Sequence, residues 1–102
     1  MKEGRKEDAG KPPIDLVPTE WVSDMALICD YGRKKYGADN WRKGFKWSRL
    51  YAAAMRHLMA FWSGSDVDES GFSHLLHAAW NCLALYWYTK RRKPDEDDRY
   101  KE

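Results

Sequence analysis

The feature that most constrains the fold is a turn of nine residues, 63–71, that separates two helical segments. The turn reads SGSDVDESG and consists almost entirely of glycines, serines and acidic residues. Before it, residues 48–63 place apolar side chains at helical spacing. After it, a second such segment runs from Ser70, a suitable N-cap, to about Lys90. A connection this short brings the second helix back against the first, so the sequence predicts an antiparallel helical hairpin.

A third helix is predicted upstream of the hairpin. Trp21, Met25 and Ile28 have helical spacing, and the pattern continues through about Tyr36. Gly37 then ends the helix, because glycine adopts the left-handed cap conformation without a steric penalty.

The segment before this helix, KPPIDLVP (residues 11–18), contains three prolines, which restrict the backbone and exclude a helix before Pro18. We therefore expect an extended strap that lies on the surface of the domain. In this strap Ile14, together with Leu16 or Val17, is expected to point inward.

These segments predict an all-α fold: a small antiparallel helical bundle of three main helices with an extended N-terminal strap. A chain of 102 residues buries a limited share of its surface, yet 15% of these residues are aromatic. We therefore expect a homo-oligomer to complete the bundle. Residues 1–10 are predicted to be flexible, 11–90 to form a single helical domain, and 91–102 to be a charged, disordered tail.

Net charge and hydropathy exclude several classes of protein. A net charge of +2 is too small for a general nucleic-acid binder. No apolar run is long enough to span a membrane, and the charged N-terminus has no signal-peptide core, so we expect no membrane partner and a cytoplasmic location.

All three histidines lie in the hairpin. His74, His77 and Asn81 follow one line along the last helix, which is otherwise apolar, and His57 lies on the preceding helix. Such a polar stripe either finds partners inside the protein or lines a site. Imidazoles beside the acidic turn suit a divalent metal, Mg²⁺ or Mn²⁺, whereas a hydrogen-bonded core pair is the other interpretation.

Cations and an aromatic loop favour an anionic ligand. Arg49 and Arg56 are seven residues apart and therefore share one face of a helix between alanines. In the loop before that helix, Asn40, Trp41 and Arg42 offer a stacking plane beside a cation, as a nucleotide needs. The alternative is that Trp41 plugs the core.

The candidate site divides into three groups of residues. For substrate binding we expect Lys11, Asn40, Trp41, Arg42, Arg49, Arg56 and Asn81; for catalysis Glu69 and Asp68; and for metal binding His57, His74 and His77. The absence of GxxxxGK[ST] and GxGxxG motifs argues against P-loop and Rossmann sites.

A longer set of motifs resembles a known family. KPPIDLVP, KYGxxNWRKG, WSRL, RHLxA and DxDESGxxHLxHAxxN are similar to the small phage-associated family described as the N-terminal region of dATP/dGTP diphosphohydrolases. The resemblance covers Lys11 to about Leu85. It implies a link to MazG-like all-α nucleoside triphosphate pyrophosphohydrolases, which use Mg²⁺ and release pyrophosphate. Those enzymes usually carry EExxE and ExxD motifs; this chain has neither and offers His74 and His77 instead.

Two functions follow as hypotheses. One is metal-dependent hydrolysis of a purine deoxynucleoside triphosphate. The other is a non-catalytic nucleotide-binding protein that sequesters a nucleotide or a nucleotide immune signal.

Overall fold

The computed structural model describes residues 3–91 and 94–100. Its main elements are three α-helices, α1 (Thr19–Tyr36), α2 (Trp47–Trp62) and α3 (His74–Arg91). Short 3-10 turns, η1 (Ile14–Leu16), η2 (Asn40–Lys43) and η3 (Pro94–Glu96), lie between and beside them. No strand forms in the described residues, which confirms the predicted all-α class.

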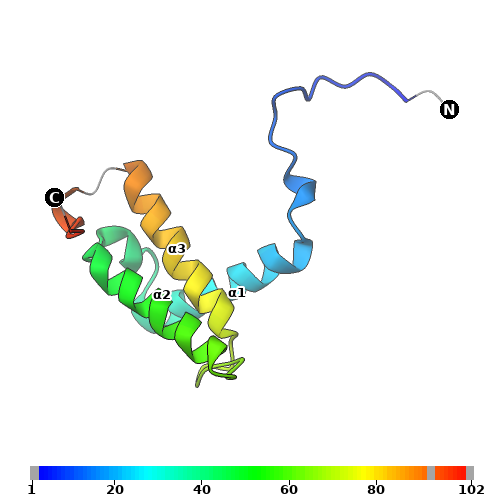
Figure 1. Ribbon diagram of the computed structural model, residues 1–102. Helices are drawn as coiled ribbons and strands as arrows, with labels where there is room; N and C mark the ends of the chain where they lie inside the picture. The colour runs from blue at the N-terminus through cyan, green and yellow to red at the C-terminus, as the bar shows by residue number, and fades with distance from the viewer. Residues whose placement is uncertain (1–2, 92–93, 101–102) are drawn as a thin grey trace.

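Helices α2 and α3 form the predicted hairpin and hold most of the core (Figure 1). Trp47 and Leu50 near the start of α2 pack against Ala84 and Tyr88 near the end of α3. The Tyr88 hydroxyl also donates a 2.5 Å hydrogen bond to the backbone carbonyl of Trp41, which ties the loop after α1 to this core.

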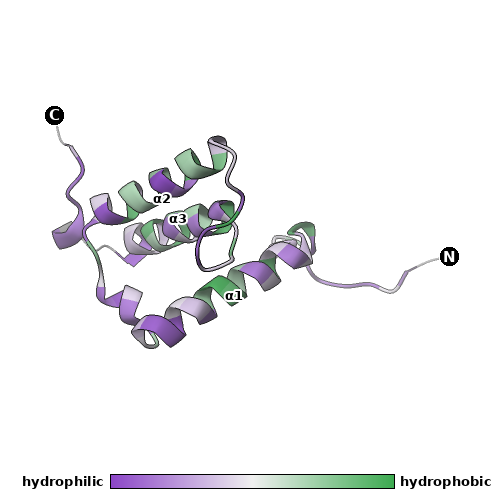
Figure 2. Ribbon diagram, turned by 90° about the horizontal axis from the view of Figure 1, so that it is seen from below, coloured by the Kyte–Doolittle hydropathy of each residue, from purple (hydrophilic) through white to green (hydrophobic). Residues whose placement is uncertain are grey.

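Helix α1 lies against α3, and its N-terminal end extends away from the hairpin (Figures 1 and 2). Met25 and Ile28 are its buried residues, and Tyr31 places its ring against Phe72, with ring centroids 5.6 Å apart. Gly37 ends the helix with φ +94°, as its position in the sequence predicts.

The arm, which we define as residues 3–18, does not lie on the domain as a strap. Figure 1 shows it leaving the N-terminal end of α1 and extending away from α2 and α3. Ile14 and Leu16 are 73% and 76% exposed, so the prediction that they point inward is wrong. The prolines exclude an α-helix before Pro18, where only the short turn η1 forms, but they carry no information about which surface the segment contacts.

Two local features of the hairpin differ from expectation. The last helix begins at His74, and Ser73, not Ser70, caps it by accepting a hydrogen bond from the backbone N–H of Leu75 at 3.1 Å. The segment 94–100, expected to be disordered, lies beside the start of α2, where a carboxylate oxygen of Asp98 accepts a 2.8 Å hydrogen bond from the backbone N–H of Ser48.

Among the described residues, no helix combines the length and the apolar character needed to cross a lipid bilayer.

Candidate functional site

A pocket of about 1030 Å³ opens where α1, the η2 loop, α2 and α3 meet. Its lining comes from the last turns of α1, the η2 loop, α2, the acidic turn and α3. Its lining brings together most of the predicted site residues, namely Asn40, Trp41, Arg42, Arg49, Arg56, Asp68, Glu69, His77 and Asn81. The cationic face of α2 and the polar line of α3 thus open onto one cavity.

The two arginines of α2 give the pocket its positive charge. Arg49 and Arg56 are both exposed, and neither forms an ion pair with any residue that the structure describes. Arg49 lies over the Phe45 ring, with its guanidinium carbon 5.2 Å from the ring centroid. Arg42, in contrast, is paired with Asp39 at 3.0 Å, so the α2 arginines are freer than Arg42 to receive an anion.

The three histidines form one connected network rather than one cluster of ligands. His57 and His74 share a hydrogen bond between their Nδ1 atoms at 2.9 Å, and His57 stacks on His77 with ring centroids 4.6 Å apart and planes 12° from parallel. His74 is buried, and its Nε2 lies 3.1 Å from Ser65 Oγ. His74 therefore supports the site from inside the hairpin and does not line the pocket.

The serine partners determine which ring nitrogens carry protons. Ser65 Oγ donates its only proton to the carbonyl of Val67 at 3.1 Å, so it accepts from the Nε2–H of His74. The Nδ1 of His74 then accepts from the Nδ1–H of His57. This assignment leaves the lone pair of His57 on Nε2.

Asp68 is held in a tight turn at the end of the pocket. Its Oδ1 accepts a 2.9 Å hydrogen bond from the backbone N–H of Ser70 and a short one from the Ser70 hydroxyl. Its Oδ2 lies 3.2 Å from Nε2 of His77, which also lies 3.0 Å from Ser70 Oγ. Glu69 beside it is exposed and, within the described part of the chain, forms no hydrogen bond or ion pair.

The environment shifts the pKa of two of these groups. Burial, and then the charge of His77, lower the pKa of His57, against the opposing charge of Asp68. Burial by itself would raise the pKa of Asp68, but the hydrogen bonds from Ser70 and the charge of His77 outweigh it, so the pKa of Asp68 is lowered. At neutral pH this combination favours a neutral imidazole beside a carboxylate.

A divalent cation would find three suitable donors here. His57, Asp68 and His77 are partly buried, and one donor atom of each lies within 4.8 Å of the others. The donor types, two imidazole nitrogens and a carboxylate oxygen, fit a divalent transition metal. Because the two rings are stacked, however, one of them would have to turn before both nitrogens could face the same ion.

Three predicted substrate-binding residues lie outside the pocket or are partly or fully buried. Lys11 lies in the arm, outside the lining of the pocket. The Trp41 ring is packed among Trp80, Trp87 and Tyr88, at centroid distances of 4.9 to 6.3 Å, so it fills the core as well as lining the pocket. Asn81 is buried, and its amide nitrogen donates to the backbone carbonyl of His77 at 2.9 Å.

Sequence reasoning missed Ser65 and Ser70 as partners of the histidines. The spacing of Asp68 and Ser70 could have indicated the second of them, because an aspartate that accepts from the backbone two residues later forms a common turn. No comparable signal marks Ser65, whose contact with His74 depends on how the two helices meet.

Comparisons with known proteins agree with the family resemblance. Residues 1–99 match the family described as "dATP/dGTP diphosphohydrolase, N-terminal". The chain is also 36% identical over 97 residues to a dATP/dGTP diphosphohydrolase of Salmonella phage PMBT28. The match covers 94% of this chain but only 33% of that relative, so the chain spans about a third of the relative's length. No solved structure is significantly similar to the chain.

Proposed function

Because this chain belongs to the family of dATP/dGTP diphosphohydrolase N-terminal domains, we propose that it binds a purine deoxynucleoside triphosphate in the pocket and hydrolyses it with the help of a divalent metal. The observation that supports this proposal most directly is the juxtaposition of Arg49 and Arg56, which lack acidic partners within the described residues, with the carboxylates of Asp68 and Glu69 in one cavity. Cations bind the phosphates, and a carboxylate at the same place can activate water.

The arginines would hold the polyphosphate along α2. Seven residues of helix separate them by roughly 10 Å along the axis, so they can contact phosphate groups at two different points of the chain of phosphates. Asn40, Arg42 and Asn81 line the same cavity and provide polar contacts for the rest of the nucleotide. With these roles, the phosphates would lie toward the acidic turn.

Hydrolysis to a monophosphate and pyrophosphate forms one bond from a water oxygen to the α-phosphorus and breaks the bond from that phosphorus to the bridging oxygen. Glu69 is the better candidate to take the proton from water, because both carboxylate oxygens of Asp68 already have partners. Arg56 would stabilise the charge that develops on the phosphate. A divalent metal held by His57, Asp68 and His77 would polarise the phosphate and lower the pKa of water.

The second candidate function is binding without turnover. One specific observation favours it: the stacking of His57 on His77 and the bond between His77 and Asp68 leave these donors engaged with one another. A chain in this arrangement would retain the nucleotide intact and so sequester it.

Incubation with dATP and with dGTP, each with Mn²⁺, Mg²⁺ or a chelator, separates these functions. If the chain is an enzyme, monophosphate and pyrophosphate appear only with metal, and Glu69→Gln lowers the rate by about 10²- to 10⁴-fold without abolishing binding. If it sequesters, denaturation of the complex returns the triphosphate unchanged.

Binding itself is tested with Arg56→Ala and Arg49→Ala, measured by calorimetry with dATP and dGTP. Each variant should raise the dissociation constant by about tenfold or more, because it removes a charged hydrogen bond to phosphate. Arg5→Ala, the same chemical change in the arm, is the matched control and should leave affinity unchanged. Equal affinity for all four proteins would contradict the assignment of the pocket.

A further inference from the structure

The chain exposes far more surface than a compact domain of its size. Its accessible surface is 8671 Å², whereas a folded monomer of 12.0 kDa exposes about 6,000 Å². Its radius of gyration of 17.3 Å likewise exceeds the roughly 13 Å of a compact domain of this length. The excess, on the order of 2,700 Å² per chain, is greater than the roughly 800 Å² that each partner contributes to a typical protein interface.

Part of this excess is the apolar content of the arm and the first turn of α1. Besides Ile14 and Leu16, the side chains of Val17, Trp21 and Val22 are all exposed, and none of the five lines the nucleotide pocket. Five large apolar side chains within nine residues are therefore exposed, with Asp15, Thr19 and Glu20 between them, and within the described part of the chain nothing buries them. Such a segment is stabilised only when another apolar surface covers it.

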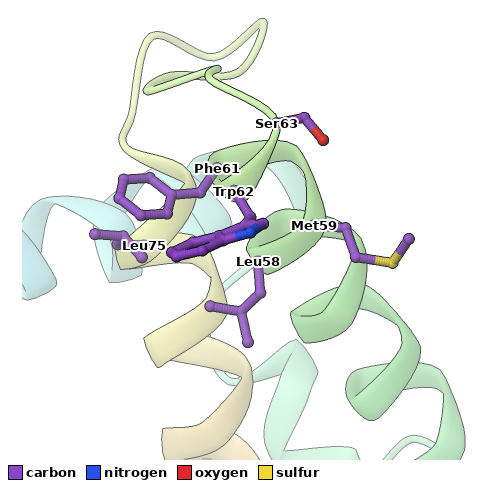
Figure 3. A pocket seen from close by; sticks show the side chains of 6 residues that line it. All are labelled: Leu58, Met59, Phe61, Trp62, Ser63 and Leu75. Carbon is purple, nitrogen blue, oxygen red and sulfur yellow. The ribbon is translucent and has the colours of Figure 1, made fainter.

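The second part is an apolar groove of about 560 Å³ at the far end of the hairpin (Figure 3). Its lining is almost entirely apolar, and Trp62 is 88% exposed. Figure 3 shows Leu58, Phe61, Trp62 and Leu75 close together where α2 ends and α3 begins, with Met59 and Ser63 pointing away from them. The lining consists of Leu58, Met59, Phe61, Trp62, Ser63 and Leu75.

The arm and the groove match in chemistry but lie apart in the same chain. The arm starts at the N-terminal end of α1, which extends away from the hairpin, whereas the groove lies at the tip of the hairpin. We propose that the arm of one chain docks into the groove of a second copy and that the exchange is reciprocal. A twofold dimer of this kind contains two identical arm–groove contacts, so the arm and the groove of each chain are both covered.

This dimer does not depend on the nucleotide pocket, because no residue of the arm or of the groove lines that pocket. A result that rules out the dimer would therefore not contradict the proposed function. Loss of nucleotide binding would likewise not contradict the dimer.

Analytical ultracentrifugation over a concentration series tests the proposal with the whole chain. We expect a dimer, and we expect Leu16→Glu in the arm and Trp62→Glu in the groove each to raise its dissociation constant by at least about 100-fold, since every change is present twice. Tyr86→Glu alters an equally large exposed side chain on α3, outside both surfaces, and should leave the dimer intact. Circular dichroism checks that the helices remain in each variant.

A cross-link identifies the occupant of the groove. In a background that replaces the two exposed cysteines (Cys29→Ser, Cys82→Ser), Leu16→Cys combined with Met59→Cys should oxidise to a disulfide between two chains. Four results would overturn the proposal: a monomer at all concentrations, a dimer insensitive to both glutamate variants, a disulfide within one chain, or no disulfide at all.

Discussion

At the scale of single residues, the site depends on how three histidines share their hydrogen bonds. His74 is buried between Ser65 and His57, while His77 faces the pocket beside Asp68. Three residues of helix separate His74 from His77 by 60° around the axis, which is enough to place one ring inside the hairpin and the other at its surface. The two residues therefore have different roles although they lie on one line of the helix.

We expect His74→Ala to destabilise the protein by about 1–3 kcal/mol, because it leaves the hydrogen-bonding groups of His57 and Ser65 without a buried partner. Chemical denaturation measures this loss. Cys82→Ala, an exposed change on the same helix, should alter the free energy of unfolding by less than about 0.5 kcal/mol. Equal losses in the two variants would mean that the Ser65–His74–His57 network does not form in solution.

The sequence predicted that the polar line of α3 has partners or lines a site, and both outcomes occur. It could not assign His74 to the first and His77 to the second, because periodicity defines a helical face only to within a stripe of side chains. The packing of α2 against α3 determines that His74 is buried and that His77 lines the pocket.

At the scale of elements, the charged segment after α3 caps the N-terminal end of α2. Lys46 is the N-cap residue of α2, but its side chain makes no capping hydrogen bond. Asp98 instead accepts hydrogen bonds from both the backbone N–H and the hydroxyl of Ser48. Arg99 lies over the Trp47 ring, 4.7 Å from its centroid. A carboxylate at this position also interacts favourably with the positive end of the helix.

Asp98→Ala should therefore lower the melting temperature, whereas Asp95→Ala, at an exposed position of the same segment that has no hydrogen bond to Ser48, should not. The hydrogen bond from the Ser48 hydroxyl, followed by that from its backbone N–H, lowers the pKa of Asp98 in the folded state. The stabilisation is thus present above the unfolded pKa of about 3.9 and is lost as the pH falls through the lower folded value.

Thermal melts from about pH 6 to about pH 3 test this dependence. The difference in melting temperature between wild type and Asp98→Ala should be constant at the upper end and should shrink at the lower end. A difference that grows as the pH falls would contradict the capping role.

At the scale of the whole molecule, the hydrophobic core cluster lies at one end of the hairpin. The buried cluster joins the start of α2 to the end of α3, while the arm and the hairpin tip contribute almost nothing to it. Substitutions of the same residue type should therefore have very different effects in the two regions.

Leu50→Ala should cost about 2–5 kcal/mol, because it opens a cavity in the buried cluster. Leu16→Ala, made in the Trp62→Glu background so that dimer formation does not enter, should change the free energy of unfolding by less than about 0.5 kcal/mol. Denaturant titrations of both variants provide the comparison. A large effect of Leu16→Ala in that background would show that the arm packs on its own domain.

The local rules were sufficient for the helices themselves. The spacing of apolar residues predicted the three helices α1, α2 and α3, and Gly37 predicted the end of α1. The short polar turn between α2 and α3 predicted that they form a hairpin. Each of these features depends on residues that are close together in the chain, so a single sequence contains the information.

Contacts between distant segments were decided only by the tertiary structure. Which face of the arm is covered, whether Trp41 belongs to the core or to the pocket, and which carboxylate caps α2 all depend on groups far apart in the sequence. Apolar burial is not directional, so the same pattern of side chains is compatible with several packings, and only the positions of the helices relative to one another select one of them.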